Sequence, residues 1–174
     1  MNLDTTTLLF LFSFGSIGSI DEFFFHHLKH KLFFRIESFH ENVMHTVRFL
    51  AYAIIFLTVA NLELRGFWSG LMLVVLACDC AIGILDILTE AKSRELLGGL
   101  SNKEYLLHMC LSFNLGIFYL SYVPRLISNF QYPASITFVT REYQLLQYGL
   151  NFMGISSVLM FITGCYLLYR IKKT

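Results

Sequence analysis

The fold is decided by residues 66–90, which read GFWSGLMLVVLACDCAIGILDILTE. A run of about 20 predominantly apolar residues is what an α-helix needs to cross the hydrocarbon core of a bilayer. Only Asp79, Asp86 and Glu90 are charged in this segment. The segment therefore predicts a membrane-spanning helix that carries three acidic side chains.

The composition of the whole chain agrees with a membrane protein. Of its 174 residues, 56% are hydrophobic and only 14% are charged, whereas about 25% of the residues in a typical soluble domain are charged. The formal net charge of +1 excludes the basic surface on which nucleic-acid binding depends. We predict one integral-membrane domain, residues 1–174, whose four cysteines are free thiols in apolar stretches.

Five apolar segments predict an all-α, polytopic membrane protein with five transmembrane helices. The predicted spans cover about residues 5–27, 38–61, 66–90, 104–122 and 143–169. The fourth span is expected to stop before Pro124, because proline interrupts helical hydrogen bonding. Consecutive spans cross in opposite directions, so the first four are expected to form an antiparallel four-helix core.

The distribution of basic residues predicts the orientation, because cytoplasmic loops carry an excess of Lys and Arg. With the N-terminus outside and the C-terminus inside, only Arg65, Arg125 and Arg141 fall at the outer face. The remaining basic residues then fall at or near the inner face: Lys29, Lys31, Arg35, Arg48, Lys92, Arg94, Lys103, Arg170, Lys172 and Lys173. We therefore predict a multi-pass protein of the inner (cytoplasmic) membrane, with its longest outer loop from about Pro124 to Glu142.

The polar residues of two spans repeat one motif. Residues 38–45 and residues 101–108 both read S-x-x-E-x-x-x-H. Ser followed by Glu three residues later is a capping box, and Glu followed by His four residues later places both side chains on one helix face. Capping alone would explain the glutamates but not the histidines, which lie one turn deeper in apolar sequence. The acid and histidine pairs are Glu41 with His45 and Glu104 with His108.

The other two spans contain matching groups at the same expected depth. The first ends with Glu22 and His26, four residues apart, and the third ends with Asp86 and Glu90. The first and third spans end at the face where the second and fourth begin, so all these groups are expected to meet at the inner side of the bundle. The layout looks like a diverged internal duplication of one helical hairpin.

Carboxylates and imidazoles from four helices predict a metal site. Two-metal sites of four-helix bundles use about four carboxylates and two histidines, commonly in Glu-x-x-His pairs. The likeness to such di-iron bundles is one of architecture, because the spacing here is Glu-x-x-x-His. Oxygen and nitrogen ligands suit iron or manganese, and also zinc. The predicted ligands are Glu22, His26, Glu41, His45, Asp86, Glu90, Glu104 and His108.

This site predicts an oxidoreductase with two divalent metal ions, iron foremost. Glu41 with His45 and Glu104 with His108 are expected to form its symmetric half. Very little chain is left outside the bilayer, so the substrate is expected to be lipid-soluble. An acyl chain or a quinone that reaches the site from the membrane would meet this requirement.

Two other uses of the cluster stay open. His45 and His108 could ligate a haem axially, although haem would not require the neighbouring carboxylates. In a non-enzymatic subunit, or in an ion or proton path, the charged groups could instead neutralise one another. For Asp79, near the middle of the third span, we expect either a protonated residue that is hydrogen-bonded to a neighbouring helix or a functional role. The groups of this ion-pair alternative are Glu41, Arg48, Asp86, Arg94 and Glu104.

A histidine-box desaturase or hydroxylase is excluded by count. The spacings from His26 to His30 and from His40 to His45 resemble fragments of its boxes. That family draws on more histidines than the 6 in this chain.

Residues 21–26, DEFFFH, and residues 104–108, EYLLH, resemble motifs of a set of small bacterial multi-pass membrane proteins. Those proteins read D-E-x-x-F-H near the end of the first helix and E-x-x-L-H at the start of a later one. The resemblance covers roughly the first four spans and not the fifth. It implies that the acid and histidine positions belong to a shared pattern, and it assigns no reaction.

Overall fold

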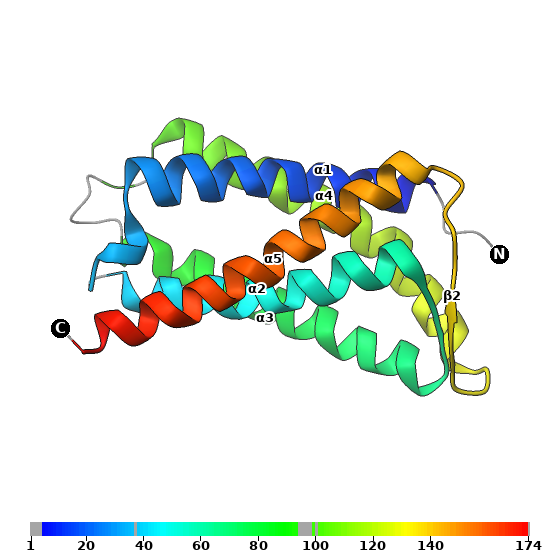
Figure 1. Ribbon diagram of the computed structural model, residues 1–174. Helices are drawn as coiled ribbons and strands as arrows, with labels where there is room; N and C mark the ends of the chain where they lie inside the picture. Colours follow the sequence, from blue (N-terminus) through cyan, green and yellow to red (C-terminus); the bar gives the residue numbers. More distant parts are fainter. Residues whose placement is uncertain (1–4, 37, 94–98, 100, 174) are drawn as a thin grey trace.

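The computed structural model describes residues 5–36, 38–93, 99 and 101–173, so Arg94 lies outside the described residues. Within them the protein is a bundle of long helices (Figure 1). Five segments are long and apolar enough to cross a membrane, which confirms the prediction of an all-α fold with five spans. The long helices are α1 (Thr5–Ile20), α2 (Phe39–Asn61), α3 (Phe67–Ser93), α4 (Asn102–Phe130) and α5 (Gln144–Ile171), and α1 continues into η1 (Asp21–Lys29).

The end of α4 differs from the sequence-based boundary. The helix does not stop at Tyr122 but continues through Pro124 to Phe130. Beyond the proline, the Asn129 side chain donates a hydrogen bond of 2.9 Å to the Leu64 carbonyl. Contacts of this kind hold the last turns of α4 in place, so tertiary packing outweighs the one hydrogen bond that a proline removes.

The five helices are arranged in a ring. Going around it, α1 packs on α4, α4 on α3, α3 on α2, α2 on α5, and α5 on α1. In contrast, α1 and α2 touch at few positions. The first four helices alternate in direction, and α5 crosses them obliquely (Figure 1). The fifth helix therefore completes the bundle by filling the space between α1 and α2.

Small residues explain why α5 packs most extensively on α2. Gly154 lies against Leu57, and Gly164 lies against Thr46. A Cβ atom at either glycine would overlap the side chain opposite. Close approach through small residues is a common way for helices to associate where lipid removes the hydrophobic driving force.

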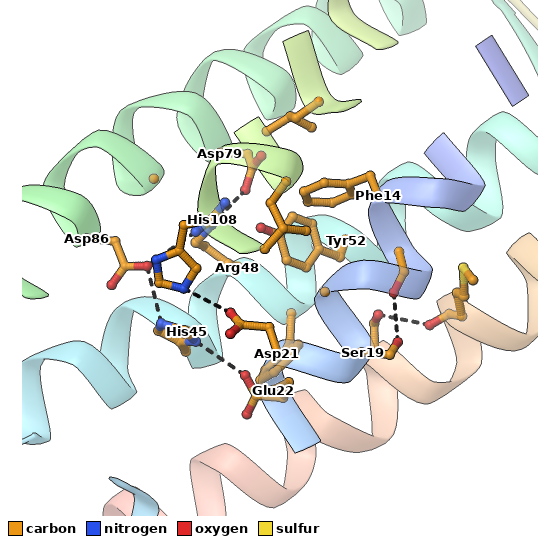
Figure 2. Close-up of a pocket in the computed structure, with 18 of the residues that line it drawn as sticks. Phe14, Ser19, Asp21, Glu22, His45, Arg48, Tyr52, Asp79, Asp86 and His108 are labelled. Atoms are coloured by element: carbon orange, nitrogen blue, oxygen red, sulfur yellow. Dashed lines mark hydrogen bonds and ion pairs between the residues drawn. The ribbon is translucent and has the colours of Figure 1, made fainter. Parts of the chain in front are cut away.

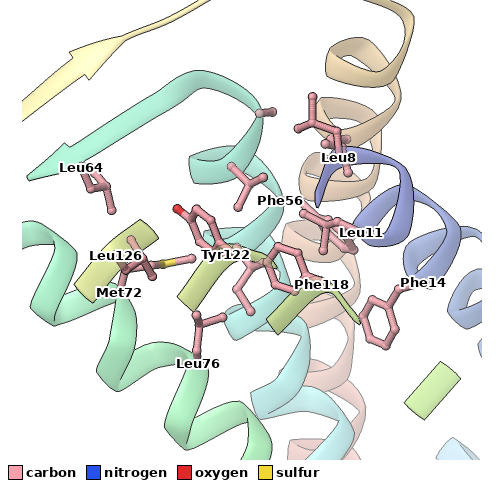
Figure 3. Close-up of a cluster of buried hydrophobic side chains, with 14 residues drawn as sticks. Leu8, Leu11, Phe14, Phe56, Leu64, Met72, Leu76, Phe118, Tyr122 and Leu126 are labelled. Carbon is pink, nitrogen blue, oxygen red and sulfur yellow. The ribbon is translucent and has the colours of Figure 1, made fainter. Parts of the chain in front are cut away.

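The packed apolar core occupies the end of the bundle that contains the start of α1. Phe118 and Tyr122 of α4 stack there with their ring centroids 5.4 Å apart. Leu8 and Leu11 of α1 and Leu76 of α3 close around them (Figure 3). Each of these side chains is at most 3% exposed. The opposite end, where α1 ends and α2 begins, contains the polar residues.

The predicted outer loop is anchored to the core end by Arg141. Strand β2 (Ser135–Phe138) of this loop pairs antiparallel with β1 (Leu62–Arg65), which connects α2 to α3. The Arg141 side chain is buried and donates hydrogen bonds to the carbonyls of Val59, Ala60 and Leu62, at distances from 2.7 to 3.2 Å. These carbonyls lie at the C-terminal end of α2, where a helix lacks its own donors.

We expect Arg141→Met to destabilise the protein. A buried acceptor that loses its donor costs about 1–3 kcal/mol, so the free energy of unfolding should fall by at least that amount. Thermal and denaturant unfolding in detergent measure the change. Arg65→Met is the matched control, since the Arg65 side chain is 46% exposed and pairs with Glu63 at the surface. Equal losses in the two variants would contradict the anchoring role.

Candidate metal centre

The segment that continues α1 is a π-helix, η1, and its geometry gathers the first set of polar groups. Its hydrogen bonds join residues five apart, so each turn is wider than in an α-helix. As a result His26 reaches two neighbouring acids, with Nε2 3.7 Å from Asp21 and Nδ1 3.5 Å from Glu22. His27 Nδ1 lies 3.3 Å from the second oxygen of Glu22. Segments of π-helix occur frequently at functional sites.

His45 of α2 lies between a carboxylate of η1 and a carboxylate of α3. Its Nδ1 is 3.4 Å from Glu22 Oε2, and its Nε2 is 3.2 Å from Asp86 Oδ2 (Figure 2). Three helices therefore meet at this imidazole. Although α1 and α2 hardly pack elsewhere, this contact joins their adjacent ends.

His108 of α4 has an equivalent position on the other side. Its Nε2 is 3.1 Å from Asp21 Oδ2, and its Nδ1 is 3.4 Å from Glu90 Oε2. Each histidine thus takes one acid from η1 and one from α3. The cluster consists of two similar halves, Glu22–His45–Asp86 and Asp21–His108–Glu90.

His26 connects the two halves. It is 2% exposed, and its ring centroid lies 4.5 Å from that of His45. Three groups of side chains have possible ligand atoms within 4.8 Å of one another, and His26 belongs to all of them. The groups are Asp21 with His26 and His108, Glu22 with His26 and His45, and Glu41 with His26 and Glu90.

The structure brings seven of the eight predicted ligands together, and Glu104 is the exception. Its Oε2 lies 3.3 Å from His30 Nε2 and 3.4 Å from Lys29 Nζ. Its backbone N–H also donates to the Ser101 hydroxyl, so the predicted capping box is formed here. The capping turn directs the Glu104 side chain towards η1, whereas His108 lies one turn further along.

The first copy of the motif differs from the second. Ser38 precedes α2 but makes no capping hydrogen bond with its side chain. Glu41 is 2% exposed and lies in the group with His26 and Glu90. His45 has its contacts with η1 and α3.

Asp21 was not among the predicted ligands. An α-helical period places Glu22 and His26 on one face and directs Asp21 away from it. The π-helix changes this period, so Asp21 contacts both His26 and His108. The available signal was an Asp-Glu pair followed by His26 and His27, four and five residues after Glu22.

Asp79 is neither isolated nor exposed. It is fully buried, and its Oδ1 accepts a hydrogen bond of 3.3 Å from Arg48 Nε. Its Oδ2 accepts one of 2.9 Å from the Tyr119 hydroxyl. Arg48 Nη1 also donates to Asp86 at 3.3 Å. Asp79 therefore has the contacts with neighbouring helices that the sequence suggested, through Arg48 of α2 and Tyr119 of α4.

Three buried carboxylate oxygens of the cluster, Asp21 Oδ1, Glu22 Oε1 and Asp86 Oδ1, lack a hydrogen-bond donor among the described residues. Asp21 and Asp86 are 6% and 8% exposed. A buried acceptor of this kind costs about 1–3 kcal/mol, and a bound ion is one of the explanations it calls for.

The cluster forms one end of a cavity of about 610 Å³ (Figure 2). Asp21, His45 and Asp86 line the polar end. Phe14 and Tyr52 line the wall towards the packed core, with ring centroids 5.4 Å apart. The polar groups therefore face a space, rather than only one another.

Comparisons with known proteins place the chain in no family: no family model, no curated protein and no solved structure matches it. The chemistry of the cluster is therefore inferred from its own side chains.

We expect Arg48→Met to destabilise the protein strongly. Removing one partner of a buried ion pair costs about 3–5 kcal/mol, because the remaining charge is left buried. Adding Asp79→Asn removes one of the two acids that Arg48 contacts, so the double variant should recover part of the loss. Denaturant unfolding of the wild type, both single variants and the double variant gives the coupling energy. A coupling near zero would contradict the pairing.

Proposed function

We propose that the protein binds two divalent metal ions in this cluster and acts as an integral-membrane oxidoreductase on a lipid-soluble substrate. One observation supports this most: three imidazoles from three helical segments each face two carboxylates, and three carboxylate oxygens beside them lack hydrogen-bond donors among the described residues. Mixed oxygen and nitrogen ligands favour iron or manganese, with zinc also compatible. Iron is the metal we propose, because the reaction is an oxidation or hydroxylation.

The two halves of the cluster suit two ions. Each half offers one imidazole and two carboxylates, which resembles the ligand set of two-metal sites in helix bundles. His26 lies between the halves with a ring nitrogen towards each. When bound, iron or manganese supplies the redox chemistry that these side chains do not have. The protein residues hold the ligands in position, since Arg48 fixes Asp86 from outside the ligand set.

We place the cluster at the cytoplasmic side of the inner membrane. Arg170 lies in the last turn of α5, and Lys172 and Lys173 follow it. Figure 1 shows this end of the chain at the same end of the bundle as η1. An excess of basic residues at one end supports a cytoplasmic location for it.

An ion-pair network is the second candidate, and the contacts of Arg48 favour it for part of the cluster. Asp79 and Asp86 both pair with that guanidinium. Asp21 differs, because within the described chain its ion-pair contacts are the histidines His26 and His108, without a lysine or arginine. Haem fits less well, since both ring nitrogens of His45 and of His108 already face carboxylates.

Metal analysis tests the proposal directly. We expect about two equivalents of iron or manganese per chain, without a Soret band, after purification in mild detergent and anaerobic reconstitution. His45→Ala and His108→Ala should each lose metal, because each removes the imidazole of one half. His40→Ala is the matched control, as His40 is exposed. A wild-type protein without stoichiometric metal would overturn the proposal.

Oxygen uptake tests the proposed oxidoreductase activity separately from metal binding. Oxygen uptake by the iron-loaded protein in lipid vesicles, with a chemical reductant, should exceed that of metal-free protein. We expect uptake to be lost in His45→Ala and kept in His40→Ala. Equal oxygen uptake in these two variants would show that the oxidation does not depend on the cluster.

Two carboxylate variants distinguish a metal site formed by the contacts described above from the ligand set that the sequence motif alone predicts. We expect Asp21→Asn to lower metal content, because Asp21 faces two of the three imidazoles. Glu104→Gln should retain metal, since Glu104 contacts Lys29 and His30. Both changes keep the size of the side chain, and elemental analysis measures both. Loss of metal in Glu104→Gln alone would show that the contacts described here do not form the site.

A further inference from the structure

The cavity is polar at one end and mainly apolar along the rest of its length, where Tyr52, Asp79 and Tyr119 also line it. Its polar end is the cluster, and its wall towards the packed core includes Phe14, Phe56, Leu115 and Met153. All of these residues belong to membrane-spanning segments. The polarity therefore changes along the cavity in the same sense as in a lipid monolayer, from a polar boundary to the hydrocarbon interior.

The cavity also reaches the lipid-facing surface between α3 and α4. Ile84 and Ile87 of α3 line it and are 54% and 61% exposed. Ser112 and Gly116 of α4 line it as well, and both are exposed. Because these positions lie in spans, their exposed surface faces the bilayer. An occupant can therefore enter sideways from the membrane.

The size of the cavity suits one small amphiphile. Its volume of about 610 Å³ falls within the range of roughly 300–1,000 Å³ that is usual for small-molecule sites. This volume, with an apolar wall and one polar end, matches a single hydrocarbon chain with one head group.

The charges at the polar end select the head group. Arg48 is the one lysine or arginine among the described residues that line the cavity, and it is already bound to Asp79 and Asp86. Asp21, Glu22, Asp86 and Glu90 also line this end, and two bound divalent ions would only balance their four charges, so an anionic head group gains no net attraction there. A cationic head group would compete with the proposed metal ions for the same carboxylates.

We infer that the cavity binds a single-chain lipid with an uncharged hydroxyl or carbonyl head group, placed with its head at the cluster and its chain towards the packed core. The choice of an uncharged head group rests on the proposed metal function. The carbons nearest the head group then lie beside the cluster, and the distal chain lies beside Phe14 and Met153.

Photo-crosslinking tests this placement. A long-chain alcohol with a diazirine near the end of its chain is added to the protein in phosphatidylcholine vesicles, and the adducts are mapped by mass spectrometry. We expect adducts beside Phe14, Leu115 and Met153, and their loss when unlabelled hexadecanol is added. Hexadecanoic acid, a hexadecyltrimethylammonium salt and a short-chain quinone should compete weakly.

Filling the cavity provides matched variants. A Cβ atom at Gly116 has no neighbour within 4 Å, and one at Gly18 meets only Leu111, at 3.6 Å. Gly116→Phe and Gly18→Phe therefore introduce a ring at the cavity wall from two different helices, and both should abolish the adducts. Leu120→Phe is the control, because Leu120 follows one turn after Gly116 and is 79% exposed.

Metal content is measured on the same samples, which separates the two proposals. Adducts scattered over lipid-facing positions such as Leu145, with metal still bound, would overturn the lipid site and leave the metal centre. Adducts in the cavity without any bound metal would overturn the metal centre instead. Equal competition by the acid, the ammonium salt or the quinone would overturn the uncharged single-chain ligand.

Discussion

The structure depends on the contacts that pair buried carboxylates with imidazoles and with Arg48 at one end of a membrane-embedded bundle. An ionised group without a partner is costly inside or beside a bilayer, so each acid of the cluster must keep its contacts on other helices. The contact of His45 with Glu22 joins α2 to η1, the segment that continues α1, although α1 itself packs little on α2. The contact of His108 with Glu90 joins α4 to α3. At this end polar contacts between helices replace the apolar packing that holds the opposite end.

This division between the two ends explains why the protein has a cavity. Large side chains such as Phe118 and Tyr122 fill the space between helices at the core end. At the other end short acids reach imidazoles across the bundle and keep the helices apart. Between the two, Gly18 and Gly116 line the wall, where an added Cβ atom would meet at most Leu111, at 3.6 Å. A cavity between a polar cluster and an apolar core is thus a consequence of how the bundle is held together.

Hydrophobic length and the direction of each span were enough to predict five helices and the meeting of acids and histidines from four of them. The contacts within the cluster were not predictable in the same way. Helical period alone directed Asp21 away from the site, because the period does not reveal a π-helix. It also placed Glu104 beside His108, whereas Lys29 and His30, far away in the sequence, attract that carboxylate. The extension of α4 beyond Pro124 depends likewise on tertiary contacts that no local pattern contains.

The arrangement of the two halves bears on the predicted duplication. The half around His45 takes two groups from the first hairpin, α1–α2, and Asp86 from the second, α3–α4. The half around His108 takes two groups from the second hairpin and Asp21 from the first. Exchanging the hairpins therefore exchanges the halves, which is the relation that two similar hairpins have when they pack around a twofold axis. Because each half needs an acid from the other hairpin, one hairpin alone cannot form either half. A duplicated and fused pair would provide both halves in a single chain.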